Sequence, residues 1–307
     1  GLDSKRVLWL AKKAREAELA EKLELLKASG RPPDARRMVR STTTGAWLTA
    51  TPSSDFGTSP SSDFGTSLSS TEFRDSLRIR HGLTPLGLAS HCDACPQARF
   101  TVGHALQCKI GGLVRARHEA VAAEWHQLCA AAFTPSAVTD EPEIPMVHTA
   151  TDGALHNTGT LRGDVSAHGF WSRGTTAIFD IRVTDTDSAS YRSTAPSKVL
   201  KRQEGEKKDK YSEACLAAHQ HFTPLVYSVD GMEGGEAIAA RKRLASRLAA
   251  KWNRNYAQVC GFVRSRLSFT LVRSTSRCLR GTRNPPPRNQ GFAWAEGSGL
   301  RLYTQLF

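Results

Sequence analysis

The feature that most constrains this chain is a set of four metal-ligating residue types in a short stretch. Cys92 and Cys95 form a C-x2-C pair, and after eight intervening residues His104 and Cys108 form an H-x3-C pair. The first pair can chelate an ion from a tight turn, and residues four apart lie on one side of a helix. Three thiolates and one imidazole suit tetrahedral zinc in a closed, structural site. We predict a zinc knuckle over residues 86–118; the alternative is three incidental buried thiols and a surface histidine.

The remaining cysteines follow a different pattern. Cys129, Cys215, Cys260 and Cys278 lie on the apolar faces of predicted helices, as small core residues do. The total of seven cysteines is odd and three of them crowd together, which argues against a disulfide framework. We therefore expect a reducing, intracellular compartment.

Positive charge is concentrated in one segment of the chain. The net charge is +13, and residues 237–295 contain 13 Lys and Arg but no Asp or Glu. Such one-sided charge indicates a polyanionic partner, most commonly nucleic acid, although a solvated basic face is the alternative. No run of 18 apolar residues occurs, which excludes a helical membrane span.

The N-terminal part is expected to lie outside the main core. The chain begins at Gly1 without an apolar signal segment, which suggests a fragment or processed product. An apolar stripe predicts an amphipathic helix over 1–30, ended by Gly30 and the following prolines. Residues 31–85 are predicted to be a linker with one short helix at 71–80. Within it SSDFGTSP at 53–60 repeats as SSDFGTSL at 61–68, which we interpret as a tolerated loop insertion.

A mixed α/β core is predicted over residues 119–284. Three β-rich apolar runs predict strands at 144–149, 177–183 and 223–229, with a polar helix at 198–219 between the last two. A helix is expected at 112–133, and two more follow Gly234 and Gly235. Pro285 to Pro287 end the ordered structure, which leaves 285–307 as a disordered tail.

Two aspartates and a lysine-rich helix form a second candidate site. Asp164 lies in LRGDV, and fifteen residues separate it from Asp180 in the strand AIFDIRV. On that strand Asp180 and Arg182 share one face, while Phe179 and Ile181 share the other. Two carboxylates near a cation suit a divalent metal that polarises a phosphate. The alternative is an edge aspartate beside an ordinary solvated helix.

The helix that follows would supply the cations. In QEGEKKDKY, Lys207, Lys210 and Tyr211 lie on one helical side at spacings of three and four. A lysine there could stabilise negative charge that develops on a phosphate during hydrolysis.

Six motifs in order resemble the carboxy-terminal region of certain retrotransposon reverse-transcriptase polyproteins. They are CDAC, GHALQC, RARHEAV, RGDV, FDIRV and EKKDKY, covering roughly residues 91–283, and the preceding GAWLTATP resembles the linker after the polymerase. In that family a Cys-Cys-His-Cys knuckle precedes a restriction-like endonuclease of the PD-(D/E)xK type. The resemblance implies an α/β fold with a restriction-endonuclease-like core, a central mixed sheet flanked by helices, that cuts DNA with Mg²⁺ or Mn²⁺.

The resemblance also assigns roles to residues. Asp164 matches the first acidic position and Asp180 the second, so both would bind magnesium. In this family the lysine has moved to the following helix, which points to Lys207, with Tyr211 nearby. The chain departs from the pattern at Arg182, where a lysine is usual, and a guanidinium can hold a phosphate but cannot give up a proton.

Further basic residues are candidates for nucleic-acid contact. Arg115, Arg117 and His118 match a basic cluster of the family, although exposed helix polarity is the alternative. The remaining candidates are Lys210 on the polar helix and Arg264, Arg266 and Arg273 in the acid-free segment.

Two functions remain open from the sequence. The first is a nuclear, metal-dependent DNA endonuclease module that nicks target DNA so that the polymerase region upstream can prime there. The second is a catalytically inactive nucleic-acid-binding remnant, and RNA is an alternative ligand to DNA. No adjacent Asp-Asp pair and no G-x-x-x-x-G-K-[ST] occurs, so the chain contains neither the polymerase motif nor a nucleotide-driven motor.

Overall fold

The computed structural model describes residues 46–49, 68–95, 98–149 and 155–283, together with four isolated positions nearer the N-terminus. These four, Lys13, Ala17, Glu21 and Ala28, are helical; the rest of the predicted helix over 1–30 lies outside the described residues. The same holds for most of the duplicated octapeptide segment and for the predicted tail at 285–307. Among the described helices, none combines the length and apolar character needed to cross a membrane.

A four-stranded mixed sheet forms the centre of the fold, as predicted in outline. The strands lie in the order β1-β4-β5-β6, with antiparallel pairing up to β5 and parallel pairing between β5 and β6. Their bounds are β1 Val138–Asp140, β4 Val165–His168, β5 Thr176–Thr184 and β6 His221–Ser228. The parallel pair is joined by helix α7, Pro196–Ala217, which is the crossover that parallel strands require.

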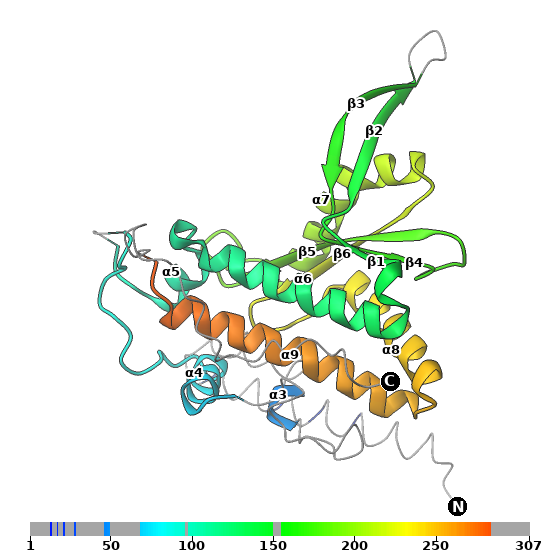
Figure 1. The fold of residues 1–307 in the computed structure, drawn as a ribbon. Helices are drawn as coiled ribbons and strands as arrows, with labels where there is room; N and C mark the ends of the chain where they lie inside the picture. The colour runs from blue at the N-terminus through cyan, green and yellow to red at the C-terminus, as the bar shows by residue number, and fades with distance from the viewer. Residues whose placement is uncertain are drawn as a thin grey trace, which may run out of the picture.

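Helices cover both faces of this sheet. Helices α6 (Leu113–Ala132), α8 (Gly235–Trp252) and α9 (Tyr256–Arg280) share one hydrophobic core with the sheet, and α6 and α9 lie side by side (Figure 1). Trp125 is at the centre of this core, where its Nε1 donates to the Tyr227 hydroxyl at 2.8 Å. On the opposite face Ile178 packs with Tyr211 of α7. The alternation predicted for the Asp180 strand is therefore confirmed.

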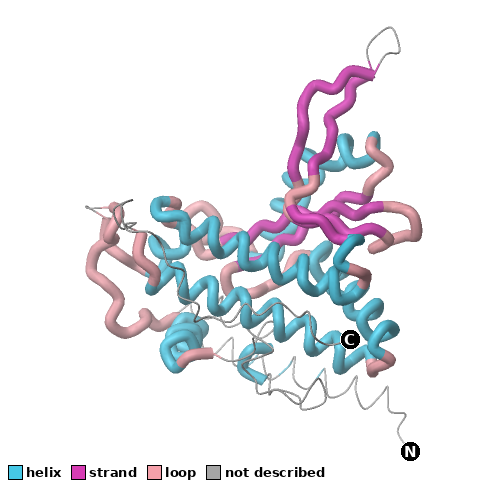
Figure 2. The backbone as a smooth tube through the Cα atoms, in the orientation of Figure 1, coloured by secondary structure: helices cyan, strands magenta, loops and turns pink. Residues whose placement is uncertain are grey.

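A two-stranded hairpin projects from the sheet (Figure 2). It consists of β2, Glu143–Thr149, and β3, Leu155–Arg162, paired antiparallel. Its base packs against α7 through Ile144 and Leu161. The sequence predicted β2 but missed β3, because LHNTGTLR has too few apolar residues to show strand alternation. It also missed the short strands β1 and β4.

Short helices of the predicted linker pack on the core. The helix predicted at 71–80 is α4 (Ser70–Arg80). Both α4 and α3 (Ala46–Thr49) contact α9, and Trp47 packs edge-to-face on Phe73. A capping box between Ser69 and Glu72 begins α4. The boundary between 118 and 119 falls inside α6, because this single helix carries the chain from the knuckle into the core.

Three short elements complete the described chain. They are α5 at Val102–Gln107 and the two 3₁₀ turns η2 at Ile110–Gly112 and η3 at Pro135–Ala137.

Candidate functional site

The four predicted zinc ligands come together as a cluster. The ligand atoms of Cys92, Cys95, His104 and Cys108 all lie within 4.8 Å of one another. Thr101 accepts a hydrogen bond from the His104 amide at 3.1 Å and so caps α5, which carries His104 and is followed directly by Cys108. The tight turn after Cys92 and this short helix are the local structures that the spacing predicted.

The geometry of the cluster fits a tetrahedral metal such as zinc. Zn–S bonds of about 2.3 Å place two sulfur ligands about 3.8 Å apart in a tetrahedron. The Cys95 and Cys108 Sγ atoms are 3.8 Å apart. The Nε2 atom of His104 is buried without a hydrogen-bond partner among the described residues, and a metal would satisfy it. Burial, and then the neighbouring thiols, raise the pKa of Cys95 to about 11, so without a cation this sulfur keeps its proton.

Asp164 lies beside Asp180, as the second candidate site requires. Its backbone N–H bonds the Phe179 carbonyl at 2.9 Å, and its Oδ2 accepts from the Ile181 amide at 2.5 Å. One residue of the β3–β4 turn therefore spans both neighbours of Asp180. The turn is tight at Gly163, where a Cβ would lie 2.6 Å from the Ile178 side chain.

His118 orients Asp164. Its Nε2 is 3.1 Å from Asp164 Oδ2 and 3.1 Å from the Ile181 carbonyl oxygen. A carbonyl oxygen cannot donate, so Nε2 must carry the proton and act as the donor. The hydrogen bond to Asp164 raises the pKa of His118 against the opposing effect of burial. His118 was predicted as a phosphate contact, whereas in the structure its Nε2 donates to Asp164.

Asp180 and Lys207 form an ion pair. The Lys207 Nζ atom of α7 is 2.5 Å from Asp180 Oδ2, and the Asp180 side chain is almost fully buried. Tyr211, one turn further along α7, donates to the Arg162 carbonyl at 3.1 Å and is contacted by Lys210 Nζ at 3.1 Å. Burial, and then the charge of Asp180, raise the pKa of Tyr211, so its hydroxyl stays protonated.

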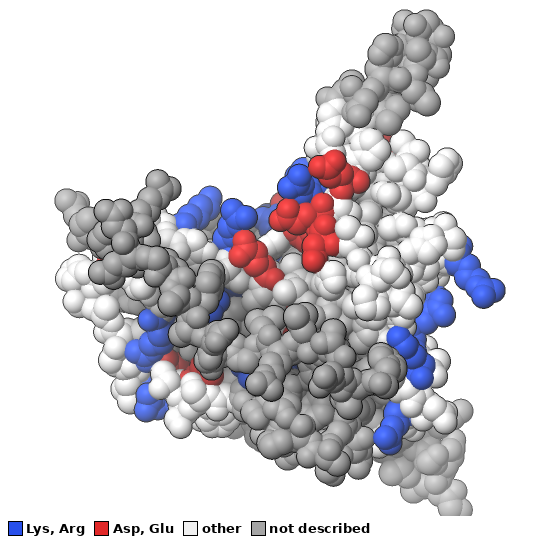
Figure 3. All heavy atoms as spheres, viewed as in Figure 1, with Lys and Arg blue, Asp and Glu red and all other residues white. Residues whose placement is uncertain are grey.

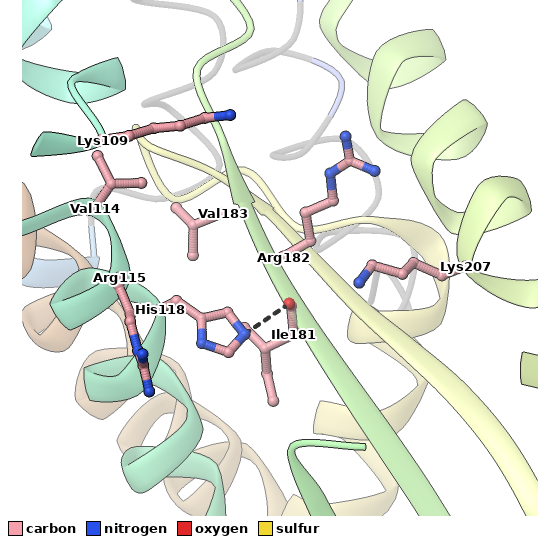
Figure 4. A pocket seen from close by; sticks show the side chains of 8 residues that line it. All are labelled: Lys109, Val114, Arg115, His118, Ile181, Arg182, Val183 and Lys207. Carbon is pink, nitrogen blue, oxygen red and sulfur yellow. Dashed lines mark hydrogen bonds between the residues drawn. The ribbon is translucent and has the colours of Figure 1, made fainter. Parts of the chain in front are cut away.

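A cavity of about 410 Å³ adjoins these residues. It is formed around β5 by the N-terminal half of α6 on one side and α7 on the other (Figure 4). Its lining residues are Lys109, Val114, Arg115, His118, Ile181, Arg182, Val183 and Lys207. Figure 3 shows acidic side chains gathered near the base of the hairpin with basic side chains beside them.

Arg182 and Lys207 reach the cavity from the α7 side of β5, and Lys109 reaches it from the segment after the knuckle (Figure 4). Arg182 also pairs with Glu206 at 2.7 Å. Lys109 was missed by sequence reasoning. Its position immediately after the predicted ligand Cys108 was the available sign, because a metal ligand fixes the backbone of its neighbour.

Three predicted nucleic-acid contacts are not free surface cations. Arg117 is 2% exposed and is held near Cys278 inside the molecule, so its guanidinium cannot reach a phosphate in this conformation. Arg266 pairs with the buried Glu124 at 2.8 Å. Burial lowers the pKa of Arg273.

The remaining two candidates are accounted for differently. Arg264 is half-buried on α9. Arg115, predicted as a nucleic-acid contact, is exposed, pairs with Glu119 at 2.7 Å on α6 and lines the cavity.

The comparisons with known proteins add no family. No protein-family model matches the chain, and no curated protein matches it.

Proposed function

We propose that this chain is a metal-dependent DNA endonuclease module of the PD-(D/E)xK class, from the carboxy-terminal region of a retrotransposon polyprotein. One observation carries the proposal: Asp164 binds the backbone next to Asp180, Asp180 pairs with Lys207, and Lys207 lines a cavity with further cations. Two carboxylates and a lysine at one point are the minimum set for metal-assisted hydrolysis of a phosphodiester.

The residues fit a hard divalent cation such as Mg²⁺ or Mn²⁺. Carboxylate oxygens are its preferred ligands, and the Oδ2 of Asp164 is already engaged by Ile181 and His118, which leaves Oδ1 for a cation. Asp180 Oδ2 is held by Lys207, whose amine would turn toward the substrate phosphate when a cation takes its place. When bound, the metal would supply Lewis acidity and lower the pKa of a water molecule.

The protein's own groups have separate tasks in hydrolysis. The water oxygen bonds to phosphorus and loses a proton to solvent, while the phosphorus–oxygen bond to the leaving strand breaks and that oxygen takes up a proton. Lys207 places positive charge beside the phosphate as negative charge develops on it. Arg182 holds a phosphate oxygen and remains charged throughout. His118 keeps Asp164 in place.

In this proposal the knuckle has a structural role. The partners are the target DNA and the polymerase region upstream in the parent chain, and the chain acts in the nucleus. The knuckle's four protein ligands leave no open coordination position, so zinc there would fold the segment rather than take part in hydrolysis.

The test is nicking of supercoiled plasmid by the purified chain with Mg²⁺ or Mn²⁺. Asp180→Asn keeps the side-chain shape but removes the charge that anchors the metal, so nicking should fall by about a hundredfold or more. DNA binding should be retained or strengthened, because one repulsion toward phosphate is lost. Glu213→Gln removes the same charge from an exposed position on α7 and should leave nicking unchanged.

Two further variants distinguish the roles of Lys207 and Arg182. Lys207→Ala should slow nicking about a hundredfold while leaving metal binding intact. Arg182→Ala should slow nicking less than Lys207→Ala does if Arg182 only holds a phosphate. It should slow nicking equally if Arg182 has taken over the role of the strand lysine. If the wild-type chain binds DNA but nicks none with either metal, the chain is an inactive nucleic-acid-binding remnant and the proposal is wrong.

A further inference from the structure

The strand at the centre of the cavity has an open edge. β4 pairs only with residues 176–179 of β5, whereas β6 runs along residues 177–184. Beyond residue 179, in the described part of the chain, no strand covers the β4 side of β5. The side chains of Asp164 and His118 take the strand's place there, since one accepts from the Ile181 amide and the other donates to its carbonyl.

Val183 continues this open edge inside the cavity. Residues two apart on a strand direct their backbone N–H and C=O to the same side, so those of Val183 face as those of Ile181 do. The neighbouring Thr184 faces the other way, and its carbonyl accepts from Val229 at the end of β6. One backbone donor and one acceptor therefore lie at the cavity wall.

The cavity combines an aliphatic floor with a cationic rim. Val114 of α6 and Val183 of β5 face each other across it, with Ile181 beside them, while Lys109 and Arg182 carry their charges at its border (Figure 4). Its volume of about 410 Å³ is in the range of small-molecule pockets, roughly 300–1,000 Å³. The apolar floor is complementary to the face of a nucleobase, and the backbone donor and acceptor are complementary to its hydrogen-bonding edge. The cationic rim is complementary to the phosphate of the same nucleotide.

We propose that this cavity binds one unpaired nucleotide of the substrate strand, next to the phosphate held at Asp164 and Asp180. In a duplex both faces of a base are stacked and its pairing edge is used, so a paired nucleotide could cover neither the floor nor the edge of β5. An extruded or mismatched nucleotide can do both. The location next to the scissile phosphate rests on the proposed endonuclease function, whereas the binding preference does not.

The inference can be tested by fluorescence anisotropy with three short labelled duplexes in Ca²⁺. One is fully paired, one carries a single bulged nucleotide, and one carries an abasic bulge with the same backbone. The bulged duplex should bind about tenfold more tightly than the paired one, and the abasic bulge should lose most of that gain, because the base itself covers the floor. Equal binding of the bulged and abasic duplexes would overturn the inference.

Matched variants locate the effect. Val114→Thr keeps the side-chain shape but makes the floor polar, and should reduce the preference for the bulge about fivefold. Val183→Thr should do the same from the strand. Val272→Thr, at a half-buried position on α9 outside the cavity lining, is the control and should change nothing. Full preference for the bulge in both cavity variants would count against this site.

Two other outcomes are separable. If a free deoxynucleoside monophosphate displaces the bulged duplex at similar concentration, the ligand is a free nucleotide and the inference about the strand is wrong. If plasmid is nicked but paired and bulged duplexes bind alike, the inference fails and the endonuclease function stands. If the bulged duplex is preferred but no plasmid is nicked, the inference about the nucleotide site stands and the proposed endonuclease function is wrong.

Discussion

Asp75 illustrates how a single residue outside every motif can join distant parts of the chain. It is 1% exposed, and its two oxygens accept from Arg280 at 2.7 and 2.9 Å. Arg280 also donates to the carbonyls of Leu86 and Gly87. The pair connects α4 to the end of α9, so the segment predicted as a linker is attached to the core by a buried charge whose hydrogen bonds are satisfied.

Asp75→Asn should therefore destabilise the fold. It removes the charge but keeps the shape, which leaves Arg280 without its ionic partner and should lower the free energy of unfolding by about 2 kcal/mol. Glu119→Gln breaks a pair whose side chains are 80% and 57% exposed, and should cost less than about 0.5 kcal/mol. Urea unfolding of both variants measures the difference. Equal values would show that burial of Asp75 contributes nothing.

At the scale of elements, the Cys-Cys-His-Cys cluster continues directly into the cavity. Cys108 belongs to the cluster, Lys109 lines the cavity, and η2 then leads to α6 with Arg115 and His118. Within η2, Gly111 has φ +76°, and a Cβ there would lie 2.4 Å from the Arg283 Cα.

Arg283 is buried against the knuckle, where it stacks on Phe100 and donates to the Ala105 carbonyl. A metal bound by the cluster would fix the start of α6 from one side, and Arg283, just after α9, fixes it from the other.

Loss of the metal should accordingly weaken nucleic-acid binding as well as unfold the knuckle. Cys108→Ser removes one thiolate of four, so bound zinc should be lost and DNA affinity should fall about tenfold as Lys109 and α6 lose their anchor. Cys260→Ser, at a half-buried cysteine outside the cluster, should retain both. Metal analysis and anisotropy on the same samples provide the test. Zinc loss with unchanged affinity would show that the knuckle is independent of the cavity.

At the scale of the whole molecule, the described part of the acid-free segment forms α8 and α9, whose cations differ in their partners. The α9 cations Arg266 and Arg280 pair with buried acids. On α8, Arg243, Arg247 and Lys251 form a row at spacings of four and donate to five backbone carbonyls, with no acidic partner among the described residues. Basic side chains without acidic ones are visible along the edge where α8 lies (Figure 3). This row on α8 therefore keeps positive charge that no carboxylate of the described residues neutralises.

The salt dependence of DNA binding should show this difference between the cations of α8 and α9. Replacing Arg243, Arg247 and Lys251 by Gln should reduce the slope of log affinity against log salt by about 3, because each phosphate contact releases counterions. The same change at Arg264, Arg266 and Arg273 should reduce it by about 1 or less. Thermal unfolding of both variants verifies that each is folded. A larger effect from the α9 triple would contradict the structure's division of the charge.

The sequence by itself determined those features that depend on local geometry. Ligands at spacings of two and three residues need only a turn and one helical turn, so the knuckle could be predicted. Alternation along β5 likewise separated Asp180 and Arg182 from Phe179 and Ile181. Apolar runs and periodicity located β2, β5 and β6 and the helices α6, α8 and α9, but not β1, β3 or β4.

Only the tertiary structure decided which side of each element meets which neighbour. Arg115 and Arg117 look alike in sequence, but two residues on a helix turn the side chain by about 200°, so one faces solvent and the other the core. His118 reached Asp164, and Lys109 the cavity, through contacts between segments that no spacing encodes. The physical reason is that local periodicity fixes the faces of an element, whereas burial of the whole chain selects their partners.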